Sequence, residues 1–191
     1  MIQIRSGVFE TNSSSTHSIA IPKHCTAADY VIFRTDDFGW GWEEVDAADY
    51  FYTAIYVTSK TEAEVNEKIE RLKNILTEHG IACKLRKPKT HTSTYDNKDY
   101  FCLDDGYIDH GWELKDFVNE LLGDGDKLVR FLSGGLVFTG NDNSSTEERC
   151  FISRDEEYLE KYNWDTNMRT QIKNKYYMSN HADYEWYYKG N

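Results

Sequence analysis

Apolar and polar residues alternate along several short runs in the first part of the chain. Residues 2–9 and 17–21 place an apolar side chain at every second position over most of their length, and residues 30–34 form a third apolar run. A period of two is typical of a β-strand with one buried face, so each run predicts a strand. If the first two strands pair, the polar connection 10–16 is too long for a two-residue turn and forms an ordered loop.

A helical period appears further along. Residues 61–80 give the clearest case, because Thr61 and Glu64 match a capping box, apolar residues follow at helical spacing, and Gly80 is suited to a left-handed stop. The same spacing predicts other helices over 43–57, 114–122, 128–132, 155–162 and 167–177.

Short apolar runs between these helices predict further strands over 81–85, 100–103 and 136–139. Because strands and helices are interleaved, the sequence predicts the α/β (α+β) class, with a mixed sheet and helices packed on it. We expect one domain over 1–191, whose C-terminal portion 151–191 is helical and rich in aromatic residues.

Composition agrees with a folded intracellular protein. At 191 residues with 39% hydrophobic residues, the chain is long enough for one buried core, and it contains no Gly/Ser-rich linker. The first residues lack the basic and apolar regions of a signal peptide, and no window approaches the length of a membrane span, so we expect a cytoplasmic protein. The four cysteines show no C-x-x-C pair and are expected to be reduced and mostly buried.

The formal net charge of −11 is unevenly distributed. Residues 36–49 and 104–126 are rich in acids, whereas residues 84–89 contain four bases and no acid. A negative surface repels phosphate backbones, which makes direct binding to nucleic acids or anionic membranes unlikely. The expected partner is a basic protein surface or a small phosphorylated ligand, and the simplest interpretation of the charged runs is solvated faces.

The segment 10–18 has the least ordinary composition, because all nine of its residues are polar. Hydroxyl groups and backbone amides in such a loop suit an anion, and a carboxylate among them suits a hard cation. The loop lacks the glycines and lysine of a P-loop. The candidate catalytic residues are Glu10 and His17, and the candidate binding residues are Arg5, Asn12, Ser13, Ser14, Ser15 and Thr16. The alternative is that these side chains bond to their own backbone and His17 is an ordinary strand residue.

A second polar segment, 139–143, follows the predicted strand 136–139. Asp142 is a further candidate catalytic residue, and Asn141 and Asn143 are candidate binding residues, because the ends of strands often carry sites. Asn-Asp-Asn is also a common turn sequence, and that alternative stays open.

The other histidines show no metal-ligand spacing, so no metal site is predicted and the cofactor is unknown. The three aspartates of 104–109 lack the spacing of a calcium-binding loop and predict a solvated acidic turn. The aromatic tail 184–188 is expected to pack in the core or at a protein interface rather than on bases, because no basic groove accompanies it.

The stretch RSGVFETNSSSTHS (5–18) resembles the start of a group of largely uncharacterised phage and prophage proteins, and TGNDN (139–143) resembles a shorter segment of the same group. Together these segments cover about a tenth of the chain. The resemblance implies a bacterial host cytoplasm and assigns no activity and no catalytic residue.

Two functional hypotheses follow. In the first, the protein is a phage-type accessory protein that binds a host protein, as an anti-defence or DNA-mimic-like inhibitor does, through its acidic surface. In the second, it is a small enzyme acting on a nucleotide or other phosphorylated substrate. There Arg5 and the hydroxyl groups of 13–16 hold the anion, His17 is the acid/base, and Glu10 or Asp142 orients His17 or a metal ion.

Overall fold

The computed structural model describes residues 15–39, 43–109, 111–141 and 184–189. The strands, in chain order, are β1 (Ser15–Pro22), β2 (Tyr30–Phe33), β3 (Asp37–Phe38), β4 (Glu43–Val45), β5 (Ala82–Leu85), β6 (Thr90–Tyr95), β7 (Lys98–Leu103), β8 (Tyr107–Ile108), β9 (Leu136–Asn141) and β10 (Tyr184–Lys189). The helices are α1 (Ala47–Val57), α2 (Glu62–Glu78), the short 3₁₀ helix η1 (Gly111–Leu114), α3 (Lys115–Gly123) and α4 (Gly125–Gly134).

The strands within these ranges form small sheets. The largest has the order β10-β1-β9-β4, and all its neighbours are antiparallel. β2 pairs with β5 and β3 pairs with β8 in parallel, and β6 and β7 form an antiparallel hairpin. The predicted α/β class is confirmed, with parallel and antiparallel pairing divided among separate sheets. The extent of the domain over 1–191 stays a prediction.

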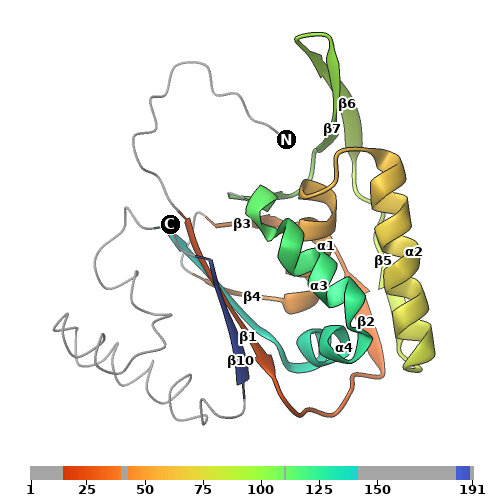
Figure 1. Cartoon of the computed structure of the whole chain (residues 1–191), viewed down its shortest axis with the longest axis vertical. Helices are drawn as coiled ribbons and strands as arrows, with labels where there is room; N and C mark the ends of the chain where they lie inside the picture. Colours follow the sequence, from red (N-terminus) through yellow and green to blue (C-terminus); the bar gives the residue numbers. More distant parts are fainter. Residues whose placement is uncertain (1–14, 40–42, 110, 142–183, 190–191) are drawn as a thin grey trace, which may run out of the picture.

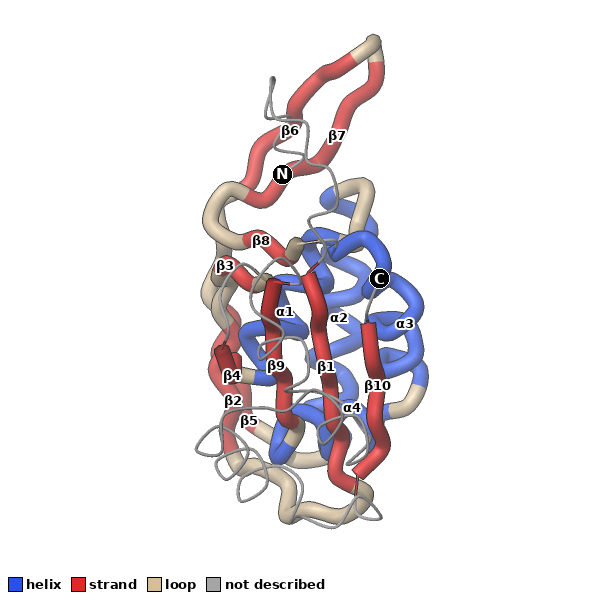
Figure 2. Tube along the Cα trace, turned by 90° about the vertical axis from the view of Figure 1, so that its left-hand side faces the viewer, coloured by secondary structure: helices blue, strands red, loops and turns tan. Residues whose placement is uncertain are grey.

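Helix α1 lies at the centre of the fold. The four-stranded sheet covers one side of the helices, and α2, α3 and α4 surround α1 on the other side (Figures 1 and 2). Buried residues follow one another along α1 and so lie on different sides of the helix: Tyr50, Phe51, Tyr52 and Ile55. A helix that is apolar around its whole circumference is stable only inside a core, and this explains why both layers pack on α1.

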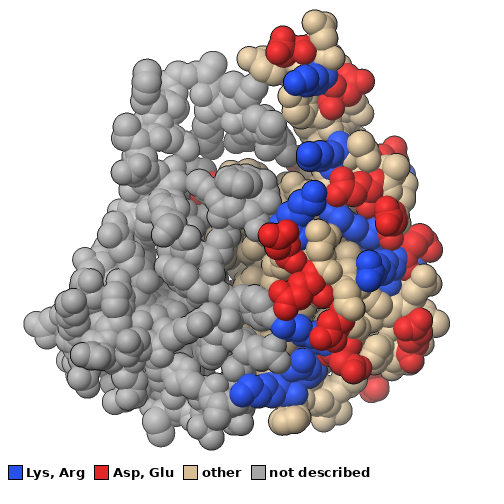
Figure 3. Space-filling model, in the orientation of Figure 1, with Lys and Arg blue, Asp and Glu red and all other residues tan. Residues whose placement is uncertain are grey.

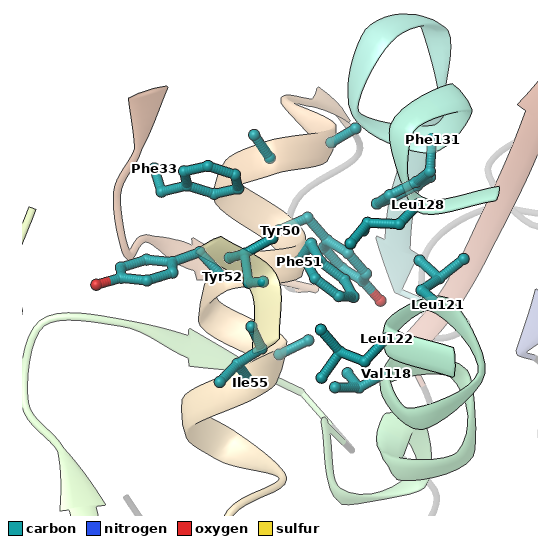
Figure 4. Close-up of a cluster of buried hydrophobic side chains, with 14 of the residues drawn as sticks. Phe33, Tyr50, Phe51, Tyr52, Ile55, Val118, Leu121, Leu122, Leu128 and Phe131 are labelled. Carbon is teal, nitrogen blue, oxygen red and sulfur yellow. The ribbon is translucent and has the colours of Figure 1, made fainter. Parts of the chain in front are cut away.

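Aromatic contacts join the helical layer. The ring of Phe131 on α4 meets Phe51 edge-on with a centroid distance of 6.1 Å and Phe117 with a distance of 5.5 Å. Leu121 and Leu122 of α3 point into the same cluster (Figure 4). Complete burial of a side chain of this size contributes about 1.5–3 kcal/mol, so this cluster is a principal source of stability.

Helix α2 agrees with its sequence signals. The Thr61 hydroxyl accepts a hydrogen bond from the Glu64 amide at 3.1 Å, and the Glu64 carboxylate accepts one from the Lys60 amide at 2.9 Å. Gly80 has the expected left-handed φ of 69°. The amino group of Lys68, although buried, lies 3.2 Å from Glu64 and 2.9 Å from the Ser59 hydroxyl. The buried ammonium group of Lys68 is therefore paired with the Glu64 carboxylate.

The predicted start of the helix over 43–57 is wrong. Residues 43–45 form β4, in which Val45 pairs with Val137 of β9. The helix begins after Asp46, whose carboxylate accepts hydrogen bonds from the amides of Ala48 and Asp49 at 2.9 and 3.0 Å. Asp46 is therefore the N-cap, and an N-cap residue has the extended backbone that ends a strand.

Two further elements were not predicted. The polar stretch 86–99 contains β6, the turn and the start of β7. The aromatic tail is β10, at the edge of the largest sheet. The predicted strand 2–9 and helices 155–162 and 167–177 lie outside the described residues.

The described cysteines are free thiols, as expected, but their burial differs from the prediction. Cys102 is buried, Cys83 is intermediate and Cys25 is exposed. Cys25 is exposed because it follows the end of β1 in a surface loop. Over the part of the chain that the structure describes, each helix is too short or too polar to cross a membrane.

His79 links the end of α2 to the start of α4. Its Nδ1 lies 2.8 Å from the Ile75 carbonyl oxygen and its Nε2 lies 3.0 Å from the Asp126 carboxylate. Both ring nitrogens face acceptors, so the doubly protonated ring satisfies both. The hydrogen bond to Asp126 is the main cause that raises the pKa of His79 above its ordinary value, and the Ile75 carbonyl adds to it.

This geometry predicts a pH-dependent contribution to stability. Because the pKa of His79 is raised in the folded state, its protonation stabilises the folded protein. This contribution is fully present below the unfolded pKa of about 6.5 and is lost as the pH rises through the folded pKa. We expect the melting temperature of the wild type, relative to His79→Gln, to fall as pH increases above about 6.5. Thermal unfolding of the wild type and of His79→Gln at a series of pH values measures this difference in melting temperature. A constant difference between them contradicts the prediction.

Candidate functional site

The described residues of the two polar segments, 15–18 and 139–141, lie at the same end of one sheet. β1 and β9 are antiparallel neighbours, and Ser15 lies opposite Asn141, Thr16 opposite Gly140, and His17 opposite Thr139. The chain preceding β1 and the chain following β9 therefore leave the sheet from adjacent positions. The remaining predicted site residues lie outside the described residues: Arg5, Glu10, Asn12, Ser13, Ser14, Asp142 and Asn143.

His17 lies inside the protein, between the sheet and α1. Its side chain is fully buried, as is that of Tyr50. The Tyr50 hydroxyl lies 2.9 Å from Nδ1 of His17, and the two ring centroids are 5.8 Å apart. Burial raises the pKa of Tyr50 well above its ordinary value, so the phenol remains protonated. Thr139, opposite His17 on β9, is also buried.

A glycine allows a loop to approach this pair closely. Gly39 has a φ of 113°, a left-handed conformation that side-chain-bearing residues rarely adopt. A Cβ at this position would lie 2.8 Å from Cβ of Asp109 and 3.4 Å from Cε1 of His17. Asp109 in turn accepts a hydrogen bond from the Tyr107 hydroxyl at 2.8 Å. Thr139 of β9, Tyr50 of α1 and Gly39 after β3 therefore lie beside the imidazole of His17, and Asp109 after β8 packs against Gly39.

Tyr50 and Gly39, which lie beside His17, and Asp109, which packs against Gly39, could not be identified as such from the sequence. The helical pattern placed other residues of 43–57 on the buried face, and no local signal distinguishes Tyr50 when the helix is buried on all sides. Asp109 was considered only with Asp104 and Asp105 as part of an acidic turn. A general acid or base must come within hydrogen-bonding distance of its substrate, whereas His17 is fully buried with Nδ1 facing the Tyr50 hydroxyl. The catalytic role of His17 stays a prediction.

Within the described ranges, no group of three or more His, Cys, Asp or Glu side chains is arranged to hold a metal ion. Among the described histidines, His91 contacts the Asp104 carboxylate and His79 contacts the Asp126 carboxylate.

The β3–β8 pairing brings the two acid-rich stretches together. Asp37 lies opposite Tyr107, and the Tyr107 amide donates to the Asp36 carbonyl oxygen at 3.0 Å. The Thr35 hydroxyl donates to the Asp105 carboxylate at 3.2 Å. We use the term acidic ledge for the four exposed aspartates at this junction: Asp36, Asp37, Asp104 and Asp105.

Close packing fixes the acidic ledge. At Gly106 a Cβ would lie 2.9 Å from Cβ of Thr35 and 3.2 Å from the Asp36 amide nitrogen, so the two segments approach more closely than a larger residue permits. The Asp105 carboxylate also accepts a hydrogen bond from the Lys89 amide at 3.0 Å. Among the described residues, Asp36, Asp37 and Asp105 form no ion pair with a lysine or arginine.

Other acids in the same stretches have structural roles. Asp46 and Asp124 cap α1 and α4. The Asp49 carboxylate accepts a hydrogen bond from the Arg34 amide at 2.8 Å, and its partial burial is the main cause that raises its pKa. These carboxylates hold helix starts and a loop in place, whereas the acidic ledge is directed to solvent.

The basic run 84–89 begins in β5 and continues beyond the end of that strand. Lys84 in β5 and Arg86 just after it are both exposed. Charged side chains on such a strand discourage pairing with other chains. In the view of Figure 3, basic and acidic side chains are interspersed over the described surface. All four bases of the run are exposed, in agreement with the interpretation of solvated faces.

Comparison with known proteins found no match among family models, curated proteins or solved structures. The resemblance to phage and prophage proteins stays a prediction.

Proposed function

We propose that this protein acts by binding a basic surface on another protein, and that the acidic ledge is part of the contact. The observation that carries the proposal is the β3–β8 pairing, which places two acidic segments from distant parts of the chain side by side. Chain connectivity does not require this arrangement. Its effect is to concentrate exposed negative charge at one rigid position.

The acidic ledge has the properties of a preorganised contact. Backbone pairing and the Thr35–Asp105 hydrogen bond fix its segments, so little conformational entropy is lost when a partner binds. The net charge of −11 attracts a basic partner over a longer range and raises the association rate. The resemblance to phage proteins supports a host protein as the partner and inhibition of host defence as the outcome.

The alternative of a small enzyme requires the His17 imidazole to reach a substrate. The full burial of His17 and its contact with Tyr50 support a structural role. The common end of β1 and β9 supports a meeting of the two polar segments, which either hypothesis accommodates. Binding is therefore the function that the geometry supports better.

Charge reversal at the acidic ledge tests the proposal. The tagged full-length protein is used to capture partners from a bacterial lysate, and each captured protein is identified and quantified by mass spectrometry. We expect Asp36→Lys combined with Asp37→Lys to reduce capture of the specific partner at least about tenfold, because unpaired like charges then face a basic surface.

The matched control is Glu67→Lys combined with Glu78→Lys, which changes the net charge equally at exposed positions of α2. This control should retain the partner. Equal capture by the wild type and the ledge variant at physiological salt would contradict the proposal, as would equal loss in both variants, which indicates dependence on net charge alone.

A further inference from the structure

The β6–β7 hairpin projects beyond the rest of the fold (Figures 1 and 2). Its turn residues Asp96 and Asn97 have φ values of 51° and 56°, the left-handed pair of a two-residue hairpin turn. Each of the two strands is six residues long, and within the described residues neither pairs with any other strand. An isolated hairpin is marginally stable in water, so an additional pairing partner would stabilise it.

The backbone of β6 presents a regular row of hydrogen-bonding groups at this open edge. The Asp104 amide donates to the Lys89 carbonyl at 2.8 Å, which marks Lys89–Asp104 as a bonded pair at the base of the hairpin. Bonded and non-bonded pairs alternate in an antiparallel ladder. It follows that Thr90, Thr92 and Thr94 occupy non-bonded pairs, and their N–H and C=O groups point away from β7.

The β6 edge also lacks the usual protection. Its sequence THTSTY contains no lysine, proline or acid, and all of its residues except Thr90 are exposed. By contrast, β5 carries the exposed Lys84, and β7 carries Lys98 and Asp99 near the turn. An exposed strand without lysine, arginine or acid and rich in β-branched residues is a template for strand pairing.

The edge is complementary to itself. In an antiparallel pairing about a two-fold axis at Thr92, Thr92 faces its own copy and Thr90 faces Thr94 of the other copy. All three residues direct their backbone groups to the edge, so each donor meets an acceptor. Pairs of threonine side chains across strands are favourable, and no like charges face one another along β6.

The same register matches charges at the two ends of the strand. It places Asp96, at the turn of one copy, opposite Pro88 of the other, between the exposed Lys87 and Lys89. The rest of the described fold lies beyond the base of the hairpin (Figure 2). Pairing through the projecting arms therefore keeps the described folds of the two copies apart, and salt screens the repulsion between their acidic residues.

We propose that β6 is a self-association edge, at which a second copy of this chain adds its own β6 in antiparallel orientation to form a continuous four-stranded sheet across the dimer. This proposal is independent of the acidic ledge. A single strand pair buries less area than a standard protein interface, so the dimer is weak and its population depends on concentration.

Analytical ultracentrifugation of the full-length protein tests the proposal. From about 1 μM to about 300 μM, we expect the mass to rise from 22.4 kDa toward about twice that value. Thr92→Lys and Thr92→Glu each place like charges at the two-fold axis. Each should raise the dissociation constant of the dimer at least about tenfold. Asn74→Lys, on an exposed position of α2, is the control and should dimerise as the wild type does.

An equimolar mixture of Thr92→Lys and Thr92→Glu gives the decisive result. If position 92 faces position 92 of a second copy, the mixture restores a dimer that neither variant forms alone, which also shows that both variants are folded. A wild type that remains monomeric throughout overturns the proposal. So does dimerisation by both single variants, which places the interface elsewhere, or a mixture that stays monomeric.

Discussion

Replacing His17 with alanine is expected to lower the free energy of unfolding by about 3 kcal/mol. The substitution removes a fully buried ring, leaves a cavity between the sheet and α1, and deprives the Tyr50 hydroxyl of its partner at 2.9 Å. Both losses act at a site that water does not reach. Chemical denaturation monitored by tryptophan fluorescence and by circular dichroism measures the change.

A double-mutant cycle separates the hydrogen bond from the packing. Tyr50→Phe keeps the ring in contact with Phe38 at 5.5 Å but removes the hydroxyl, and we expect a loss of about 1–2 kcal/mol. The two losses should not add, because each single substitution already breaks the same bond. A stable His17→Ala protein would contradict this account, and if it had also lost a measurable activity, His17 would be a catalytic residue instead.

Replacing Phe131 with alanine is expected to cost about 4 kcal/mol, near the upper end for core truncations. Phe131 is fully buried and its ring contacts Phe51 and Phe117, so a single substitution removes aromatic contacts from α4 to both α1 and α3. Differential scanning calorimetry should show a melting temperature lowered by several degrees or more.

Tyr95→Ala is the matched control for aromatic truncation, because Tyr95 is 62% exposed at the end of β6. Its expected effect lies within about 0.5 kcal/mol. A loss for Phe131→Ala as small as that for Tyr95→Ala would show that α4 contributes little to the core.

The parts of the fold that were predictable are those in which local sequence and tertiary packing agree. In α2, the cap at Thr61, the apolar spacing and Gly80 all act within a few residues of one another, and the structure places the helix where they predict. Strand β1 was similarly visible, because Ile19 and Ile21 face a core on one side.

The remaining elements depend on contacts that are distant in sequence. β4 forms because Val45 pairs with Val137, although its residues also suit a helix. In β6 both faces are polar, so the strand carries no alternation to detect. Strands of two residues such as β3 and β8 exist only through their pairing, and for that reason the acidic ledge could not be assembled from the sequence.

In the candidate site, too, local features were predictable from the sequence and contacts between distant segments were not. The composition of 10–18 and 139–143 identified two unusual segments, and the register of β1 against β9 brings their described ends together. The environment of His17 was beyond sequence reasoning, because alternation along a strand shows which side chains share a face but not what lies against that face. Tyr50 and Gly39 reach His17 only through the packing of α1 and the β3 segment.

The position of β1 in the largest sheet has a consequence for synthesis on the ribosome. β1 is among the first described residues to be translated, yet its two neighbours, β9 (136–141) and β10 (184–189), follow it by more than a hundred residues. Both edges of β1 therefore lack these partners until those residues have been translated. Until then the unpaired edges of β1 are open to pairing with other chains.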